Sequence, residues 1–202
     1  MPKREFDFLP PVRLILTHLP TIRKIDTIYN DGMLTAELER FLKHLAVRIR
    51  EEIPEVNTWE SEIPCEALFF FPGKSWRVVK DDHIAVCVHM QQCVEPEFNN
   101  DVDDPFVGLY VPKWKHLQSF TNHLKGLHIP GFEHISEHEE SDMIDNFRQY
   151  PLWSTVHLTP LVKQSTLDVD GLERAIVDRV RKLVVKEDKI TTLISKLRPK
   201  AV

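Results

Sequence analysis

The strongest constraint on the fold of this chain is a change of hydrophobic period near its middle. Four short runs are rich in aromatic and β-branched residues, a composition typical of strands. They span residues 65–71, 76–79, 83–90 and 106–111. Pro72-Gly73 and Asp81-Asp82 mark turns between the first three runs, and connections this short join antiparallel strands. We therefore expect a meander within a mostly antiparallel central sheet of about four strands.

Apolar residues recur at helical spacing before and after these runs. In the first half, an amphipathic helix is predicted from Thr35, as its N-cap, to Ile53, with Pro54 just past its end. Its apolar stripe comprises Leu38, Phe41, Leu42, Leu45, Ile49 and Ile53. A second helix is expected from Pro112 to Gly126, followed by an aromatic patch at 147–158 that packs on the sheet. The predicted fold class is α+β, with helices flanking the sheet.

Residues 169–197 predict a long C-terminal helix, or two shorter ones. Apolar residues recur at alternating spacings of four and three. They are Ile176, Val180, Leu183, Ile190, Ile194 and Leu197, and Glu187 interrupts the stripe. Such a stripe covers a core or forms a coiled coil, so self-association through this helix is an open alternative.

Length and composition favour one domain inside the cell. The 202 residues fit a single α+β domain spanning 1–202, with residues 1–11 as a loose N-terminal arm. No run approaches the ~18 to 20 apolar residues of a membrane helix. Three cysteines and no secretory pattern at the N-terminus indicate a reducing compartment. We expect a cytoplasmic protein.

Charge is distributed unevenly along the chain. Residues 95–145 contain eleven acidic side chains and three lysines, whereas residues 173–200 contain nine basic and four acidic side chains. The basic segment can face the acidic half of its own fold, an acidic partner or nucleic acid. Its candidate partner- or nucleic-acid-binding residues are Arg174, Arg179, Arg181, Lys182 and Lys186.

Two groups of residues suggest metal binding. His134 to His138 match H-x-x-E-H, in which two histidines one helical turn apart bind zinc and Glu137 activates water. The surrounding sequence is acidic, and no third ligand is marked, so a solvated stretch is the favoured interpretation. Cys87 and His89 share one side of a predicted strand. Together with Cys93, and with Cys65 or His83 as a further ligand, they could form a zinc site, but no C-x-x-C pair supports it, and a buried cysteine is the simpler interpretation.

Motifs for other chemistry are missing from the sequence. We find no G-x-S-x-G elbow, no phosphate-binding glycine loop and no dinucleotide fingerprint. We therefore predict no catalytic residue, no metal ligand and no cofactor.

The order of elements resembles the PD-(D/E)XK nuclease-like superfamily. The likeness runs over most of residues 35–197, from the first helix through the meander, the strand at 105–111 and the segment Tyr150-Pro-Leu-Trp. It implies a strand-borne Asp and a Glu-x-Lys that hold magnesium and activate water. This chain departs from that pattern, because 85–92 contains no Glu-x-Lys and the preceding strand has no carboxylate before Asp81 and Asp82.

A nuclease-like scaffold without its metal ligands implies a binding or regulatory module. The leading hypothesis is a non-enzymatic accessory subunit with a protein partner, in a prokaryotic defence or mobile-element system. One alternative is a nuclease or phosphodiesterase in which Asp81, Asp82 and a glutamate of the first helix hold magnesium or manganese. Another is sequence-independent nucleic-acid binding through the basic C-terminal segment.

Overall fold

The structure is a computed structural model. It describes residues 33–64, 67–79, 82–90, 104–112, 120–124, 126–134, 149–163 and 166–197. The chain divides into two compact units, Met1–Glu37 and Leu38–Val202. Only residues 33–37 of the first unit are described, and the predicted arm at 1–11 lies outside the described residues. The features below belong to the second unit, except residues 33–37 at the start of the first helix.

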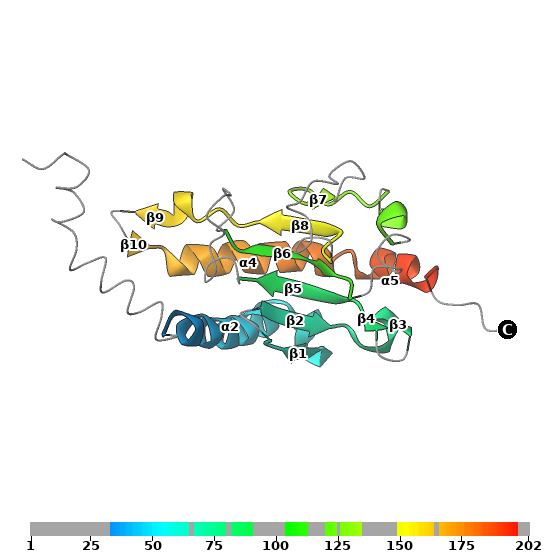
Figure 1. Ribbon diagram of the computed structural model, residues 1–202, viewed down its shortest axis with the longest axis horizontal. Helices are drawn as coiled ribbons and strands as arrows, with labels where there is room; N and C mark the ends of the chain where they lie inside the picture. Colours follow the sequence, from blue (N-terminus) through cyan, green and yellow to red (C-terminus); the bar gives the residue numbers. More distant parts are fainter. Residues whose placement is uncertain are drawn as a thin grey trace, which may run out of the picture. The chain divides into compact units, whose positions relative to one another are not determined.

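A six-stranded antiparallel sheet forms the centre of this unit (Figure 1). In spatial order its strands are β1 (Glu60–Glu62), β2 (Ala67–Phe71), β5 (Ala85–His89), β6 (Phe106–Tyr110), β8 (Leu152–Thr155) and β7 (Glu133–His134). The expected α+β class and antiparallel sheet are confirmed, but the sheet is wider than the predicted four strands. β1 was missed because its sequence, Glu-Ser-Glu, has no apolar residue to signal a strand.

The predicted three-stranded meander is wrong in its second strand. β3 (Arg77–Val79) leaves the central sheet and pairs with β4 (Asp82–His83) as a separate hairpin. β2 pairs directly with β5 instead. The physical reason is Trp76, whose fully buried side chain donates from Nε1 to Thr191 Oγ1 at 3.0 Å and ties this segment to the C-terminal helices.

The described helices pack on one face of the sheet. They are α2 (Met33–Glu52), α4 (Val169–Val184) and α5 (Glu187–Ser195). Their apolar stripes share a single core with inward-facing strand residues such as Phe70, Val88 and Leu109. The predicted stripe of the first helix is confirmed, since Leu42, Leu45, Ile49 and Ile53 are all buried. No described helix is both long and apolar enough to cross a membrane.

The first helix begins earlier than predicted. α2 begins at Met33, so Thr35 lies inside the helix and is not its N-cap. In residues 169–197, the second of the two predicted arrangements is found: two shorter helices, α4 and α5, meet at Val185 and Lys186. This break follows the interrupted stripe at Glu187, and it lets both helices place their apolar residues in the same core.

The second face of the sheet carries a separate aromatic cluster. Small residues on two neighbouring strands, Ala85 and Cys87 on β5 and Gly108 on β6, leave room for the ring of Tyr150. Tyr150 packs on the rings of Phe106 and other cluster members. The expected packing of the aromatic patch on the sheet therefore holds for Tyr150, whereas residues 152–155 form strand β8 of the sheet itself.

Residues 120–124 are helical, within the helix predicted from Pro112 to Gly126. Phe120 and Leu124, one helical turn apart, are fully buried. Residues 113–119, including Trp114, lie outside the described residues.

Candidate interaction surfaces

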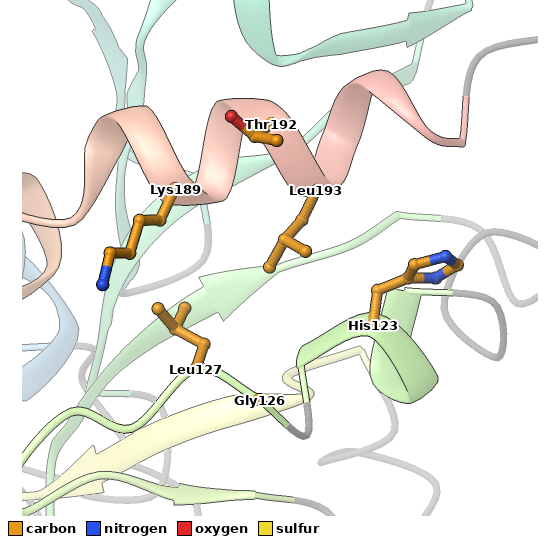
Figure 2. A pocket seen from close by; sticks show the side chains of 6 residues that line it. All are labelled: His123, Gly126, Leu127, Lys189, Thr192 and Leu193. Atoms are coloured by element: carbon orange, nitrogen blue, oxygen red, sulfur yellow. The ribbon is translucent and has the colours of Figure 1, made fainter.

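A shallow hollow lies between α5 and the loop that follows residues 120–124 (Figure 2). Its volume is about 290 Å³. Six residues line it: His123, Gly126, Leu127, Lys189, Thr192 and Leu193. Figure 2 shows Lys189 and Leu193 extending from α5 toward Leu127. The hollow thus combines an apolar centre with a cationic side chain at its rim.

A second candidate surface is the hairpin formed by β9 (Val162–Lys163) and β10 (Thr166–Leu167). Asp168 N donates to Leu161 O at 2.8 Å and extends the pairing to the start of α4. Asp104 fixes the preceding segment, because its carboxylate accepts from Leu158 N and contacts His157 Nδ1, each at 2.8 Å. The base of the hairpin is therefore firmly anchored.

The hairpin exposes apolar side chains. Val162 and Leu167 are direct cross-strand partners, and they are 48% and 37% exposed. Val169 follows at the first position of α4 and is also 48% exposed. β9 and β10 pair only with each other among the described strands. We call Val162, Leu167 and Val169 the hairpin patch.

Arg179, one of the predicted binding residues, is held inside the fold. Its guanidinium donates to Ser154 Oγ at 3.0 Å, and to Thr155 O and Ala175 O at 2.9 Å each. Desolvation by burial lowers the pKa of Arg179. The guanidinium joins α4 to β8, with donors on both of its terminal nitrogens and on Nε engaged.

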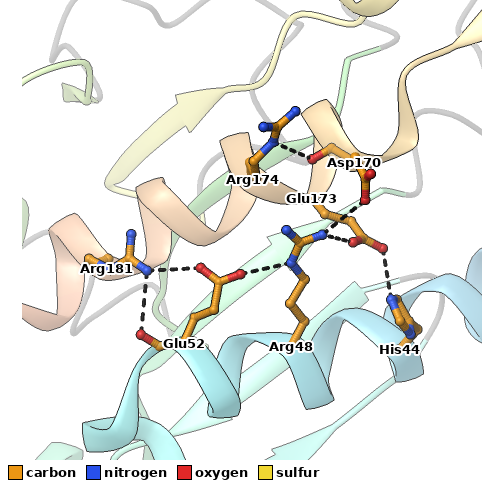
Figure 3. Close-up of polar contacts among 7 residues, drawn as sticks. All are labelled: His44, Arg48, Glu52, Asp170, Glu173, Arg174 and Arg181. Atoms are coloured by element: carbon orange, nitrogen blue, oxygen red, sulfur yellow. Dashed lines mark hydrogen bonds and ion pairs between the residues drawn. The ribbon is translucent and has the colours of Figure 1, made fainter.

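A polar network joins α2 to α4 (Figure 3). The buried carboxylate of Glu173 pairs with Arg48 and lies 3.2 Å from His44 Nε2. Arg48 also donates from Nε to Glu52 at 2.9 Å, and Arg181 contacts the same carboxylate at 3.2 Å. The hydrogen bond from Arg48, followed by that from Arg181, lowers the pKa of Glu52 against the opposing effect of desolvation. The network is a charge-paired seam between the two helices.

The predicted basic residues are thus separated by the structure. Arg181 belongs to the seam, and Arg174 donates to the backbone oxygen of Asp170 on its own helix. Lys182 pairs with Asp178 at 2.9 Å. Lys186 sits at the N-cap of α5, past the end of α4. The prediction that these five residues bind a partner or nucleic acid stays a prediction.

The H-x-x-E-H string does not begin on a helix. His134 lies in strand β7, with its Nε2 at 3.1 Å from Leu127 O. The alternative in which His134 and His138 pair across one helical turn therefore lacks a helix at its first histidine. Glu137 and His138 lie outside the described residues.

Cys87 and His89 do share a face of β5, as predicted. Both contact Tyr150, with Cys87 Sγ 4.0 Å from its hydroxyl and the His89 ring centroid 5.5 Å from its ring. Burial raises the pKa of the Cys87 thiol, which keeps it protonated and unreactive. His83 accepts from Arg77 Nε at 3.1 Å. Cys65 and Cys93 lie outside the described residues.

The carboxylates proposed for an atypical nuclease site are not brought together in the described part of the chain. No group of three His, Cys, Asp or Glu side chains with a geometry for metal binding occurs among the described residues. In α2, Glu39 pairs with Lys43 and Glu52 pairs with Arg48. Asp81 lies outside the described residues, so this alternative also stays a prediction.

Sequence reasoning missed both the hairpin patch and the hollow. The hairpin strands are too short to give a period, and the hollow joins residues far apart in the chain. Comparisons with protein-family models, with curated proteins and with solved structures find no match for this chain. Its function is therefore argued from its own surfaces.

Proposed function

We propose that the protein is a non-enzymatic interaction module that binds a protein partner through the hairpin patch. The observation that carries this proposal is the exposure of Val162 and Leu167 on one anchored hairpin, with Val169 exposed two residues further on at the start of α4. Single exposed apolar residues are ordinary on protein surfaces, but a cross-strand pair with a third neighbour is a local concentration.

The backbone of the hairpin supports the same proposal. A two-stranded ribbon leaves strand edges with unpaired N–H and C=O groups, to which a partner strand can add. Main-chain hydrogen bonds would then give affinity, while Val162 and Leu167 supply apolar contact. The anchoring of the hairpin base by Asp104 reduces the ordering cost of binding.

The wider setting of this proposal comes from the sequence. The resemblance to the PD-(D/E)XK superfamily, without its Glu-x-Lys, supports an accessory or regulatory subunit of a prokaryotic defence or mobile-element system. The internal pairing of Arg179 and Arg181 favours a protein partner over nucleic acid, since these cations already bind the chain's own oxygens.

The test is affinity capture of the tagged full chain from its own cells, with and without nuclease treatment. The hairpin variant carries Val162→Ser and Leu167→Ser. The control carries Val47→Ser and Val185→Ser, two valines outside the patch that are more exposed than Val162 and Leu167. We expect a stoichiometric protein that survives nuclease, is lost from the hairpin variant and is retained by the control.

Two results would overturn the proposal. The first is a partner held equally by both variants, which would place the interface elsewhere. The second is recovery of nucleic acid alone, which would favour the basic C-terminal segment and call for cleavage assays with magnesium and manganese.

A further inference from the structure

The hollow of Figure 2 has a chemical character distinct from that of the hairpin patch. Its centre is apolar, with Leu127 buried and Leu193 half-buried. In the view of Figure 2, Lys189 and His123 stand at opposite ends, with the two leucines between them. Apolar walls with few polar groups at the rim are the usual construction of a small-molecule site.

Lys189 gives the hollow its charge preference. Its side chain is exposed, and no hydrogen bond or ion pair engages its ammonium within the described part of the chain. A lysine next to an apolar wall can lay its methylene stem along that wall and keep its ammonium in water. A ligand with an apolar body and a negative end would contact both.

The size of the hollow limits the ligand. About 290 Å³ is close to the lower bound for ligand pockets, and it corresponds to about ten water molecules at their liquid volume of roughly 30 Å³ each. A branched aliphatic or monocyclic acid fits this space.

We propose that this hollow binds a small organic carboxylate with a branched or aromatic tail. The tail lies between Leu127 and Leu193, and the carboxylate pairs with Lys189. The loop side contributes Gly126, an exposed lining residue at which an added Cβ would meet no atom within 4 Å.

The test uses 4-methylpentanoate as the probe and its uncharged amide, 4-methylpentanamide, as the matched ligand. Each is titrated into the ¹⁵N-labelled full chain while backbone amide resonances are followed. We expect the acid to shift resonances of residues 126–127 and 189–193 with a Kd of about 1 mM, which is typical for a ligand of this size. The amide should bind about fivefold more weakly, as expected for loss of one exposed ion pair.

Three variants sharpen the result. Lys189→Gln should weaken the acid about fivefold and leave the amide unchanged. Lys196→Gln, an exposed lysine on the same helix outside the hollow, should change neither. Gly126→Leu should block both ligands by filling the open space, and its amide spectrum reports whether the fold is kept.

The proposal fails if the acid produces no shifts, or if the shifts fall outside the lining residues. It fails equally if Lys189→Gln binds the acid as well as the wild type does, or if Gly126→Leu binds both ligands unchanged.

Discussion

At the scale of single residues, the decisive observation is that charge in the sequence does not translate directly into a charged binding face. Arg179 and Arg181 were singled out for their clustering, yet Arg179 ties β8 to α4 and Arg181 closes the seam with Glu52. Spacing on a helix tells which residues share a face, but not which oxygens from other elements meet them. Those oxygens, Ser154 Oγ and Thr155 O, come from a strand that the sequence did not reveal.

The role of Arg179 predicts a large effect of a conservative change. Arg179→Lys keeps the charge but cannot serve Ser154, Thr155 and Ala175 together. We expect a loss of about 1–2 kcal/mol in the free energy of unfolding, measured by urea denaturation. Arg174→Lys, at an exposed site on the same helix, should cost less than about 0.5 kcal/mol. Equal losses in the two variants would contradict the structural role of Arg179.

The seam predicts a pH dependence through Glu52. Its pKa is lowered in the folded protein, so its contribution to stability is present above the unfolded pKa and is lost as pH falls through the folded pKa. The wild type should therefore exceed Glu52→Gln in stability near neutral pH, and the difference should disappear as pH falls below the ordinary pKa of a glutamate, about 4.3. Urea denaturation from neutral to acidic pH checks this. Glu51→Gln, an exposed neighbour, should remain parallel to the wild type; a Glu52→Gln curve that does the same would refute the account.

At the scale of elements, the sequence predicted the buried helix and strands but not the short strands at the edges of the sheet and in the hairpin. The apolar stripe of α2 was identified because the helix buries one regular face. The runs at β2, β5 and β6 were identified because nearly every residue in them is apolar and buried. β1, β7 and the β9–β10 hairpin are two or three residues long, which is too short for any period to appear. The departure of β3 from the central sheet depends on the hydrogen bond from Trp76 to Thr191 of α5, which lies far along the chain.

Close pairing of β6 and β8 gives a prediction at this scale. A Cβ on Gly108 would lie 2.7 Å from Leu152 O and 3.2 Å from the Cβ of Trp153. Because the nearest atom belongs to the backbone of β8, the clash can be relieved only by moving that strand away from β6. Gly108→Ala should therefore destabilise by about 1–3 kcal/mol, although alanine normally favours a strand over glycine.

The matched control for this change is Gly126→Ala, where the added Cβ meets open space. It should alter the free energy of unfolding by less than about 0.5 kcal/mol. Thermal or urea unfolding of both variants decides the matter, and a neutral Gly108→Ala would show that β6 and β8 are farther apart than described.

At the scale of the molecule, the compact unit from Leu38 to Val202 places its described helices on one face of the sheet and an aromatic cluster on the other. Side chains that could take part in chemistry instead make contacts within the fold: Glu173 pairs with Arg48, and the Cys87 thiol contacts the hydroxyl of Tyr150. The hairpin patch is a described surface that the fold does not use for itself. This contrast is the physical basis for the proposed interaction module.

The sequence therefore predicted the fold class and part of the core, but not the surfaces on which function is proposed. The hairpin patch depends on exposure, and exposure depends on which segments cover each other. Val162 and Leu167 look like ordinary strand residues in the sequence, as do the buried Val88 and Leu109. Only their placement on a two-stranded ribbon distinguishes them.

The most direct measurement is site-specific photocrosslinking of the full chain in its own cells, with a photoreactive amino acid placed at Val162 or, as the matched control, at Val185. The account predicts a discrete crosslinked protein at Val162, unchanged by nuclease treatment, and none at Val185. Crosslinks of equal strength at both positions, or nuclease-sensitive products at Val162, would contradict the claim that the hairpin patch binds a protein partner.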